Sequence, residues 1–376
     1  MAHREVLQDL FQPLTVRSLT IPNRFAMAPM TRQASPGGIP GVDVADYYRR
    51  RAAGGVGLII TEGIRLPDPA AGFPASVPTI AGDEVLAGWT RVVDGVHAEG
   101  ATIAAQLWHQ GVERRDDDGV VPVGPSGVDG RGEPRGRALG RDELHRIAQE
   151  YAHSAANARD VGFDAVEIHG AHGYLLDEFF WERTNRRTDE YGGSLAERTR
   201  FPAEVVAAVR EAVGPDYPII FRFSQWKGTD YTASIVEDPT QLAELLTPLV
   251  DAGVDMLHPS TRRHYVPAFE DHPEDHPEDH EAGLSLAGWT KKVTGVPVIA
   301  VGSVGLDTQF RSEKRGEVIA PAPIDRLVEQ FEAGEFDVVA VGRALLADPT
   351  WVNRLRRGEL DGFGGYDAAA ALSKLA

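Results

Sequence analysis

The sequence predicts an α/β protein, a (β/α)8 TIM barrel formed by one domain that spans residues 1–376. Short apolar runs rich in Val and Ile alternate along the chain with amphipathic segments of helical periodicity. Strands that are apolar on both faces and alternate with helices are typical of parallel β/α units. Eight such units favour a closed barrel over an open doubly wound sheet.

The expected strands are flanked by Gly, Pro or Asp and cover, in chain order, Phe25–Met30, Val56–Thr61, Thr102–Trp108, Asp164–His169, Pro218–Ser224, Val254–His258, Pro297–Val301 and Phe336–Val341. The expected helices cover Val42–Ala53, Glu84–Glu99, Arg141–Val161, Leu195–Val213, Thr240–Ala252, Ser285–Val293, Ile324–Ala333 and Thr350–Arg357. A Rossmann fold would require Gly-x-Gly-x-x-Gly after the first strand, where the chain instead reads Ala28-Pro29-Met30-Thr31-Arg32. Alternating apolar residues in Phe11–Asn23 predict a small hairpin that closes the barrel floor.

Two segments differ from this pattern. Gly111–Gly140 is long, charged and rich in Gly and Pro, and because it follows the third strand we expect a loop over the catalytic face. His272–His280 repeats His-Pro-Glu-Asp and lies between the sixth and seventh strands. Its acidity and proline content predict a solvated loop, with metal capture by its histidines as the alternative.

Composition excludes several classes of function. The formal net charge is −18, and no basic stripe is present, so nucleic acid is not an expected partner. The chain has no cysteine, which excludes disulfides, thiolate metal sites and a cysteine nucleophile. We find neither a signal peptide nor an apolar run that could span a membrane, and therefore expect a cytoplasmic protein.

Polar residues within the predicted strands are informative, because the interior of such a barrel is packed with apolar side chains. Alternation places Arg222 on one face of the fifth strand, and a buried guanidinium must meet a carboxylate or a ligand. Glu167, one strand away, is the structural partner to weigh against a ligand. On the third strand Gln106 shares a face with Trp108, and its amide would suit either an imide edge or neighbouring backbone.

Other strand ends carry groups that would face the same ligand. Thr31 and Gly63 follow the first and second strands, although local hydrogen bonding or a simple turn would also account for them. The seventh and eighth strands end in Val301-Gly302-Ser303 and Val341-Gly342-Arg343, where these barrels often bind phosphate. Residues that could face a common ligand are thus assigned at the ends of the first five predicted strands and of the seventh and eighth. A large, flat, imide-bearing and phosphorylated ligand, for which FMN is suitable, is therefore predicted.

The fourth strand leads into the stretch Glu167–Asp177, which places His169, His172 and Tyr174 within a few residues of one another. We expect this strand to break at Gly170. Imidazole and phenol are common choices for orienting a carbonyl group and moving a proton. A metal site using the two histidines with Glu167 is the alternative, but further ligands at strand ends are missing.

The chain resembles the Old Yellow Enzyme family of FMN-dependent ene-reductases from Leu10–Leu14 to Trp351. The most specific matches are Val166–Leu176 and Asn185–Ser194. In this resemblance, Thr31 is similar to the family's threonine at flavin O4. Gln106 is similar to the glutamine at the pyrimidine edge of the flavin, and Arg222 to the arginine beside N1 and O2. Flavin-lining residues are implied at Pro29, Met30 and Gly63, and the phosphate cradle at Val301, Gly302, Ser303, Gly342 and Arg343.

The resemblance also implies a mechanism. His169 and His172 would grip the carbonyl oxygen of an α,β-unsaturated substrate, and Tyr174 would donate a proton at Cα, with NADH or NADPH as reductant. The second gripping residue is asparagine in many relatives, and Ser224–Trp226 also departs from the commonest family pattern. The implied protein is a monomer or homodimer that acts on a small activated alkene. Oxidative N-demethylation and nitroester or nitroaromatic reduction are alternatives on this scaffold, and a non-catalytic flavin sensor is a further one.

Overall fold

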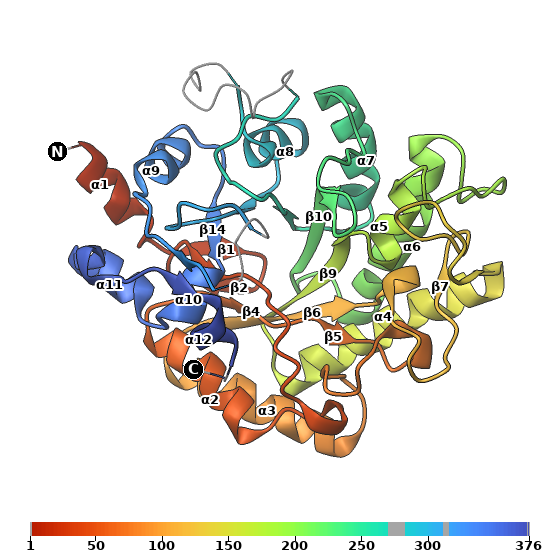
Figure 1. Cartoon of the computed structure of the whole chain (residues 1–376), viewed down its shortest axis with the longest axis horizontal. Helices are drawn as coiled ribbons and strands as arrows, with labels where there is room; N and C mark the ends of the chain where they lie inside the picture. Colours follow the sequence, from red (N-terminus) through yellow and green to blue (C-terminus); the bar gives the residue numbers. More distant parts are fainter. Residues whose placement is uncertain (1, 270–282, 311–315, 374, 376) are drawn as a thin grey trace.

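The fold is described from a computed structural model that covers residues 2–269, 283–310, 316–373 and 375. Within them, eight parallel strands form the central barrel (Figure 1). In spatial order they are β11 (Met256–Pro259), β10 (Ile219–Lys227), β9 (Ala165–His172), β6 (Thr102–Trp108), β4 (Leu58–Ile60), β3 (Phe25–Met27), β14 (Val338–Val341) and β12 (Ile299–Val301). Bridges from Leu257 to Val298 and from Ser260 to Val301 close β11 onto β12. The predicted (β/α)8 barrel is confirmed.

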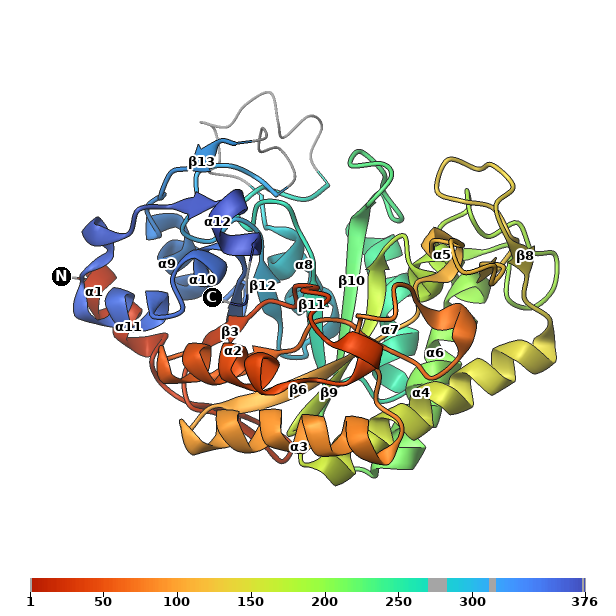
Figure 2. The same ribbon diagram turned by 60° about the horizontal axis from the view of Figure 1, so that its bottom comes forward.

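Helices between the strands lie on the outside of the barrel, and α3 packs beside α4 (Figure 2). They are α2 (Val42–Ala53), α3 (Asp83–Ala98), α4 (Arg141–Val161), α6 (Leu195–Val213), α7 (Pro239–Asp251), α8 (Leu286–Thr294), α9 (Asp325–Glu332) and α11 (Trp351–Arg357). The bounds of α2, α4 and α6 are those predicted, because their ends carry clear signals. The Ser194 side chain caps α6, and Gly162 ends α4 in a left-handed conformation.

Several short elements were not predicted from the sequence. They are the helices α1 (Ala2–Asp9), α5 (Leu175–Phe180), α10 (Arg343–Ala347) and α12 (Ala368–Leu372), the strands β5 (Ile64–Arg65), β7 (Val123–Gly124), β8 (Arg137–Ala138), β13 (Val318–Ile319) and β15 (Tyr366–Asp367), and 3-10 turns at Pro36–Gly38, Pro69–Ala71, Gly111–Glu113 and Leu360–Gly362. Most of these runs have too few residues for a periodic pattern to be distinguished.

The predicted N-terminal hairpin is present as β1 (Leu14–Val16) and β2 (Leu19–Ile21). Its buried residues Val16, Leu19 and Ile21 join the inward-facing strand residues in one apolar cluster. That cluster includes alanine, leucine, isoleucine and valine side chains from the strands. The hairpin therefore closes the floor of the barrel, and the open end lies at the carboxyl ends of the strands.

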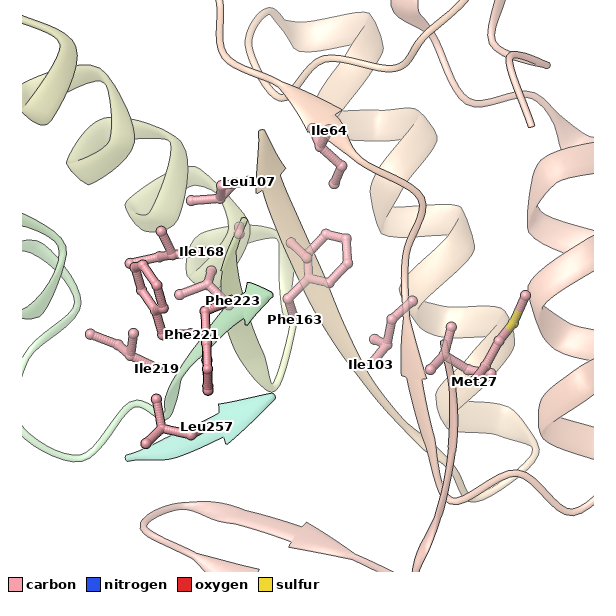
Figure 3. Packing of buried hydrophobic residues seen from close by; sticks show 14 of the residues in the cluster. Met27, Ile64, Ile103, Leu107, Phe163, Ile168, Ile219, Phe221, Phe223 and Leu257 are labelled. Carbon is pink, nitrogen blue, oxygen red and sulfur yellow. The ribbon is translucent and has the colours of Figure 1, made fainter. Parts of the chain in front are cut away.

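The opposite faces of the strands pack against the helices. Ile219, Phe221 and Phe223 lie on this outer side of β10 with Ile168 of β9 nearby (Figure 3). Burial of each such side chain stabilises the fold by ~1.5–3 kcal/mol. Alternation then directs Arg222 into the barrel, as the sequence predicted.

The predicted break of the fourth strand at Gly170 is wrong, because β9 continues to His172. A Cβ atom at position 170 would lie 2.4 Å from Cζ of Phe221. Glycine is therefore needed here for close packing against the neighbouring strand rather than for a turn. This extension of β9 carries His172 to the rim of the barrel, where His172 pairs with Lys227 at the end of the neighbouring strand β10.

Gly111–Gly140 contains β7 and β8, and its residues Glu113 and Arg115 line the cavity described below, so it covers the predicted face. The acidic repeat His272–His280 lies outside the described residues. Among the helices that are described, none combines the length and the apolar character needed to cross a bilayer.

Candidate active site

A cavity of about 740 Å³ opens at the carboxyl ends of the barrel strands. The residues predicted for cofactor and substrate binding that line it are Pro29, Met30, Thr31, Gln106, His169, His172, Tyr174, Arg222, Val301, Gly302, Ser303, Gly342 and Arg343. Residues contributed by strands distant in the sequence thus share one space. In active sites of this fold, catalytic groups typically occupy this end of the barrel.

Gly63 does not line the cavity. A Cβ atom at this position would lie 2.5 Å from Cε3 of Trp108, whose indole does line it. The glycine therefore makes room for the tryptophan, and its contribution to the site is indirect. Alternation along β6 had already placed Trp108 on the face of Gln106, which was the only sequence signal for it.

A buried carboxylate organises the inner end of the cavity. Glu167 accepts a hydrogen bond of 2.7 Å from Nε2 of Gln106 and pairs with Nδ1 of His258 at 2.6 Å. Burial acts to raise the pKa of Glu167, but His258, Arg222 and Gln106 together hold it below its usual value. The Gln106 amide is therefore oriented by Glu167, and not by backbone, with its oxygen left for another partner.

Arg222 supplies a positive charge to the same wall. Its Nη2 donates to Oγ of Ser260 at 3.1 Å, and its Nε has no hydrogen-bond partner among the described residues. Burial lowers the pKa of Arg222 to about 10, and the nearby Glu167 opposes that shift. The guanidinium is thus still protonated at neutral pH. An unpaired buried N–H group is costly, which indicates that a ligand completes this site.

The three side chains predicted to handle the substrate lie together. The rings of His169 and His172 are 5.1 Å apart, and that of Tyr174 lies 5.2 Å from His169 and 4.9 Å from Trp108. Burial, followed by the charge of Arg222, lowers the pKa of His169 to about 3. His169 is therefore neutral at physiological pH and acts through one N–H group.

The backbone that joins His172 to Tyr174 has an unusual conformation. His172 has φ 67° and Gly173 has φ 87°, a region that non-glycine residues seldom adopt. The amide of His172 donates to Oγ of Ser224 at 2.9 Å, and that of Gly173 to Oδ2 of Asp177 at 2.6 Å. These two acceptors hold the turn that places both functional side chains.

The predicted phosphate cradle lies on neighbouring strands, because Val301 of β12 pairs with Ala340 of β14. Gly302 has φ 142°, and a Cβ atom there would lie 2.8 Å from the backbone nitrogen of His264. Nη2 of Arg343 donates to Oγ of Ser303 at 2.8 Å. Glycine backbone, a hydroxyl and a guanidinium thus line the cavity on two neighbouring strands, and such groups bind phosphate.

The sixth strand end, where the sequence offered no candidate, also contributes. His258 lies on β11, and Ser260 follows it at the cavity wall. Trp226 lines the cavity and packs its ring 4.5 Å from that of His172. The partners of His258 and Ser260 are distant in the chain: Glu167 is 91 residues from His258, and His172 and Arg222 are 88 and 38 residues from Ser260.

Comparison with known proteins assigns this (β/α)8 barrel to the class of flavin-dependent oxidoreductases. The chain is a member of the NADH:flavin oxidoreductase / NADH oxidase family, which it matches over residues 9–361. The relatives described below place it in the Old Yellow Enzyme family, as the sequence predicted.

NADH oxidase of Thermoanaerobacter brockii is 36% identical over 362 residues, covering 93% of this chain and 51% of that protein, so the chain spans about half of that relative. The 12-oxophytodienoate reductase 7 of Oryza sativa subsp. japonica is 32% identical over 94% of this chain and 89% of the relative. Among solved structures, morphinone reductase in complex with tetrahydroNAD has a TM-score of 0.77 and 31% identity, covering 96% of this chain and 93% of that one.

Proposed function

We propose that this protein is an FMN-dependent ene-reductase that uses NADH or NADPH to reduce the carbon–carbon double bond of an α,β-unsaturated carbonyl compound. The observation that carries the proposal is the shared cavity. It places a charged, amide-bearing wall, formed by Gln106 and Arg222, within the same space as His169, His172 and Tyr174. The relatives named as 12-oxophytodienoate reductase and morphinone reductase support this reading.

The cavity suits FMN in several respects. The orphaned Nε of Arg222 and the oriented amide of Gln106 would meet the polar edge of the flavin ring, with Thr31 near O4. Gly302, Ser303, Gly342 and Arg343 would hold the phosphate. When bound, FMN supplies a two-electron carrier that accepts hydride from the nicotinamide and passes it from N5 to the substrate Cβ.

The residues of the chain then bind and protonate the substrate. His169 and His172 donate hydrogen bonds to the carbonyl oxygen and so draw electron density from the alkene. This oxygen gains negative charge during the reaction, and a donor placed for it is worth about 3–4 kcal/mol in comparable sites. Tyr174 donates its phenolic proton to Cα. Trp108 and Trp226 limit the space available to the substrate.

The test starts from the purified holoprotein. A yellow protein that releases FMN, loses its colour with NADH or NADPH under anaerobic conditions and regains it with cyclohexenone would support the proposal. A nitroester is tested as an alternative oxidant of the reduced protein, and a tertiary N-methylamine as an alternative reductant of the oxidised protein. Reoxidation by the nitroester with none by cyclohexenone would contradict it, as would a protein without flavin.

A further inference from the structure

Ser260 links the two sides of the cavity. It follows β11, is 3% exposed, and lies between the wall that carries Arg222 and the rim that carries His172. Its Oγ is 3.1 Å from Nη2 of Arg222 and 2.8 Å from Nε2 of His172. One hydroxyl therefore contacts both the guanidinium assigned to the flavin side and the imidazole assigned to the substrate side.

The donors and acceptors around this hydroxyl can be counted. Arg222 can only donate, so it occupies one lone pair of the Ser260 oxygen. The hydroxyl proton of Ser260 has no other acceptor among the described residues than Nε2 of His172. A buried hydroxyl without an acceptor costs ~1–3 kcal/mol. Donation from Ser260 to Nε2 is therefore favoured, and in neutral His172 the proton is then on Nδ1.

Neighbouring groups restrict the imidazole further. The indole of Trp226 packs 4.5 Å from the ring of His172 at an angle of 31°, and its Nε1 donates to the backbone oxygen of Ser260 at 3.0 Å. The backbone amide of His172 is held by Ser224. His172 is thus held on one face of its ring, at Nε2 and at its backbone amide. This arrangement is expected for a side chain that must be oriented.

We propose that Ser260 is a positioning residue that holds His172 in the tautomer with its proton on Nδ1 and connects it to Arg222. The role rests on the proposed function, in which His172 donates to the substrate oxygen. The donor offered to the substrate is then Nδ1–H, since Nε2 is engaged as an acceptor. Ser260 itself contacts His172 and Arg222 and orients the substrate only through them.

The tautomer is tested directly by nuclear magnetic resonance of holoprotein labelled with 15N-histidine. In the wild type, Nδ1 of His172 should carry the proton and Nε2 should show the shift of an unprotonated nitrogen. The Ser260→Ala variant should show a mixture of tautomers, whereas Ser260→Thr, which keeps the hydroxyl, should retain the wild-type pattern. A protonated Nε2 in the wild type, or an unchanged pattern in Ser260→Ala, would overturn the proposal.

Two substitutions of His172 separate its nitrogens. The side-chain amide nitrogen of asparagine is the same number of bonds from Cβ as Nδ1 of histidine. The amide nitrogen of glutamine is the same number of bonds from Cβ as Nε2 of histidine. His172→Asn should keep the affinity for p-hydroxybenzaldehyde within about threefold, and His172→Gln and Ser260→Ala should weaken it about tenfold, the effect of one hydrogen bond. Equal losses for the two His172 variants would contradict the assignment. The resonance spectra and the binding measurements do not depend on catalytic turnover. A protein that fails to reduce cyclohexenone would therefore contradict only the proposed function, and not the role of Ser260.

Discussion

Nζ of Lys227 lies 2.7 Å from Oδ1 of Asp177, and both side chains are fully buried. Lys227 ends β10, and Asp177 lies in the first turn of α5, where its other oxygen accepts the amide of Gly173. Burial raises the pKa of Asp177 and lowers that of Lys227, and the pairing opposes both shifts. The pair therefore fixes the turn between His172 and Tyr174 to the neighbouring strand.

The Lys227→Met variant should be less stable by ~3–5 kcal/mol, because it leaves the Asp177 carboxylate buried without its partner. The double variant with Asp177→Asn should recover much of this loss, since asparagine can still accept the amide of Gly173. Urea unfolding followed by circular dichroism measures both. Equal stability of the single and double variants would show that the buried charge is not the cause.

Replacement of Tyr174 by Phe should separate the two halves of the reaction. Loss of a general acid slows a step ~10²–10⁴-fold, so reoxidation of the reduced protein by cyclohexenone should slow by that factor. Reduction by NADH or NADPH should be unchanged, because no proton from Tyr174 is needed. Stopped-flow absorbance follows each half. Tyr217→Phe, which alters a buried tyrosine just before the start of β10, away from the cavity, is the control. Equal slowing of both halves would refute the assignment.

The His169→Ala variant should bind p-hydroxybenzaldehyde at least about tenfold more weakly, through loss of a hydrogen bond to the ligand oxygen. The pKa of His169 is lowered to about 3, so the side chain is neutral from pH 5 upward. The ratio of wild-type to variant affinity should therefore be constant from pH 5 to pH 8. A ratio that changes by tenfold in this range would show that His169 titrates.

The Arg222→Ala variant should bind FMN more weakly and lower its reduction potential, because a positive charge beside the reduced flavin is removed. For a two-electron couple, each ~1.4 kcal/mol corresponds to about 30 mV. Fluorescence of released FMN and a dye-coupled potential measurement test this. Arg198→Ala removes an arginine that is 5% exposed, similar to the 6% of Arg222, and that lines a separate cavity. A wild-type potential in Arg222→Ala would mean that the arginine is structural.

The stability of the folded protein should depend on pH through Glu62. Its carboxylate is buried and accepts the amides of Arg32 and Gln33, next to the cavity residue Thr31. Burial raises the pKa of Glu62 to about 7, so the folded state holds the proton more tightly than the unfolded chain. Its stabilising contribution is complete below about pH 4.5 and is lost as pH rises to about 7.

The Glu62→Gln variant keeps an oxygen for both amides and removes the titration. Between pH 4.5 and 7 it should become more stable relative to the wild type by about 1.4 kcal/mol per pH unit, with no further change above pH 7. Urea unfolding of both proteins at pH 5, 6, 7 and 8 measures the difference. A constant difference over this range would mean that Glu62 is ionised throughout.

The barrel and many of the cavity-lining residues could be predicted from residue patterns over short stretches of the sequence. Alternation of period two placed Gln106 and Arg222 on the inner face, and capping residues set the ends of α4 and α6. The prediction of a strand break at Gly170 was wrong. A glycine in this position resembles a turn residue, but it is needed because a side chain there would collide with the ring of Phe221 on the next strand. Gly63 likewise accommodates a side chain from another strand, that of Trp108.

The order of apolar runs and helices determined the fold, because burial of alternating side chains depends only on near neighbours in the chain. The positions of His169, His172 and Tyr174 could also be named from the sequence. Only the tertiary structure decided their chemical states and partners. Glu167 pairs with Gln106 and His258, and His172 contacts Ser260, and each contact joins residues from different β/α units of the barrel. Hydrogen bonds of this kind depend on distances across the barrel, which no periodicity along the chain encodes.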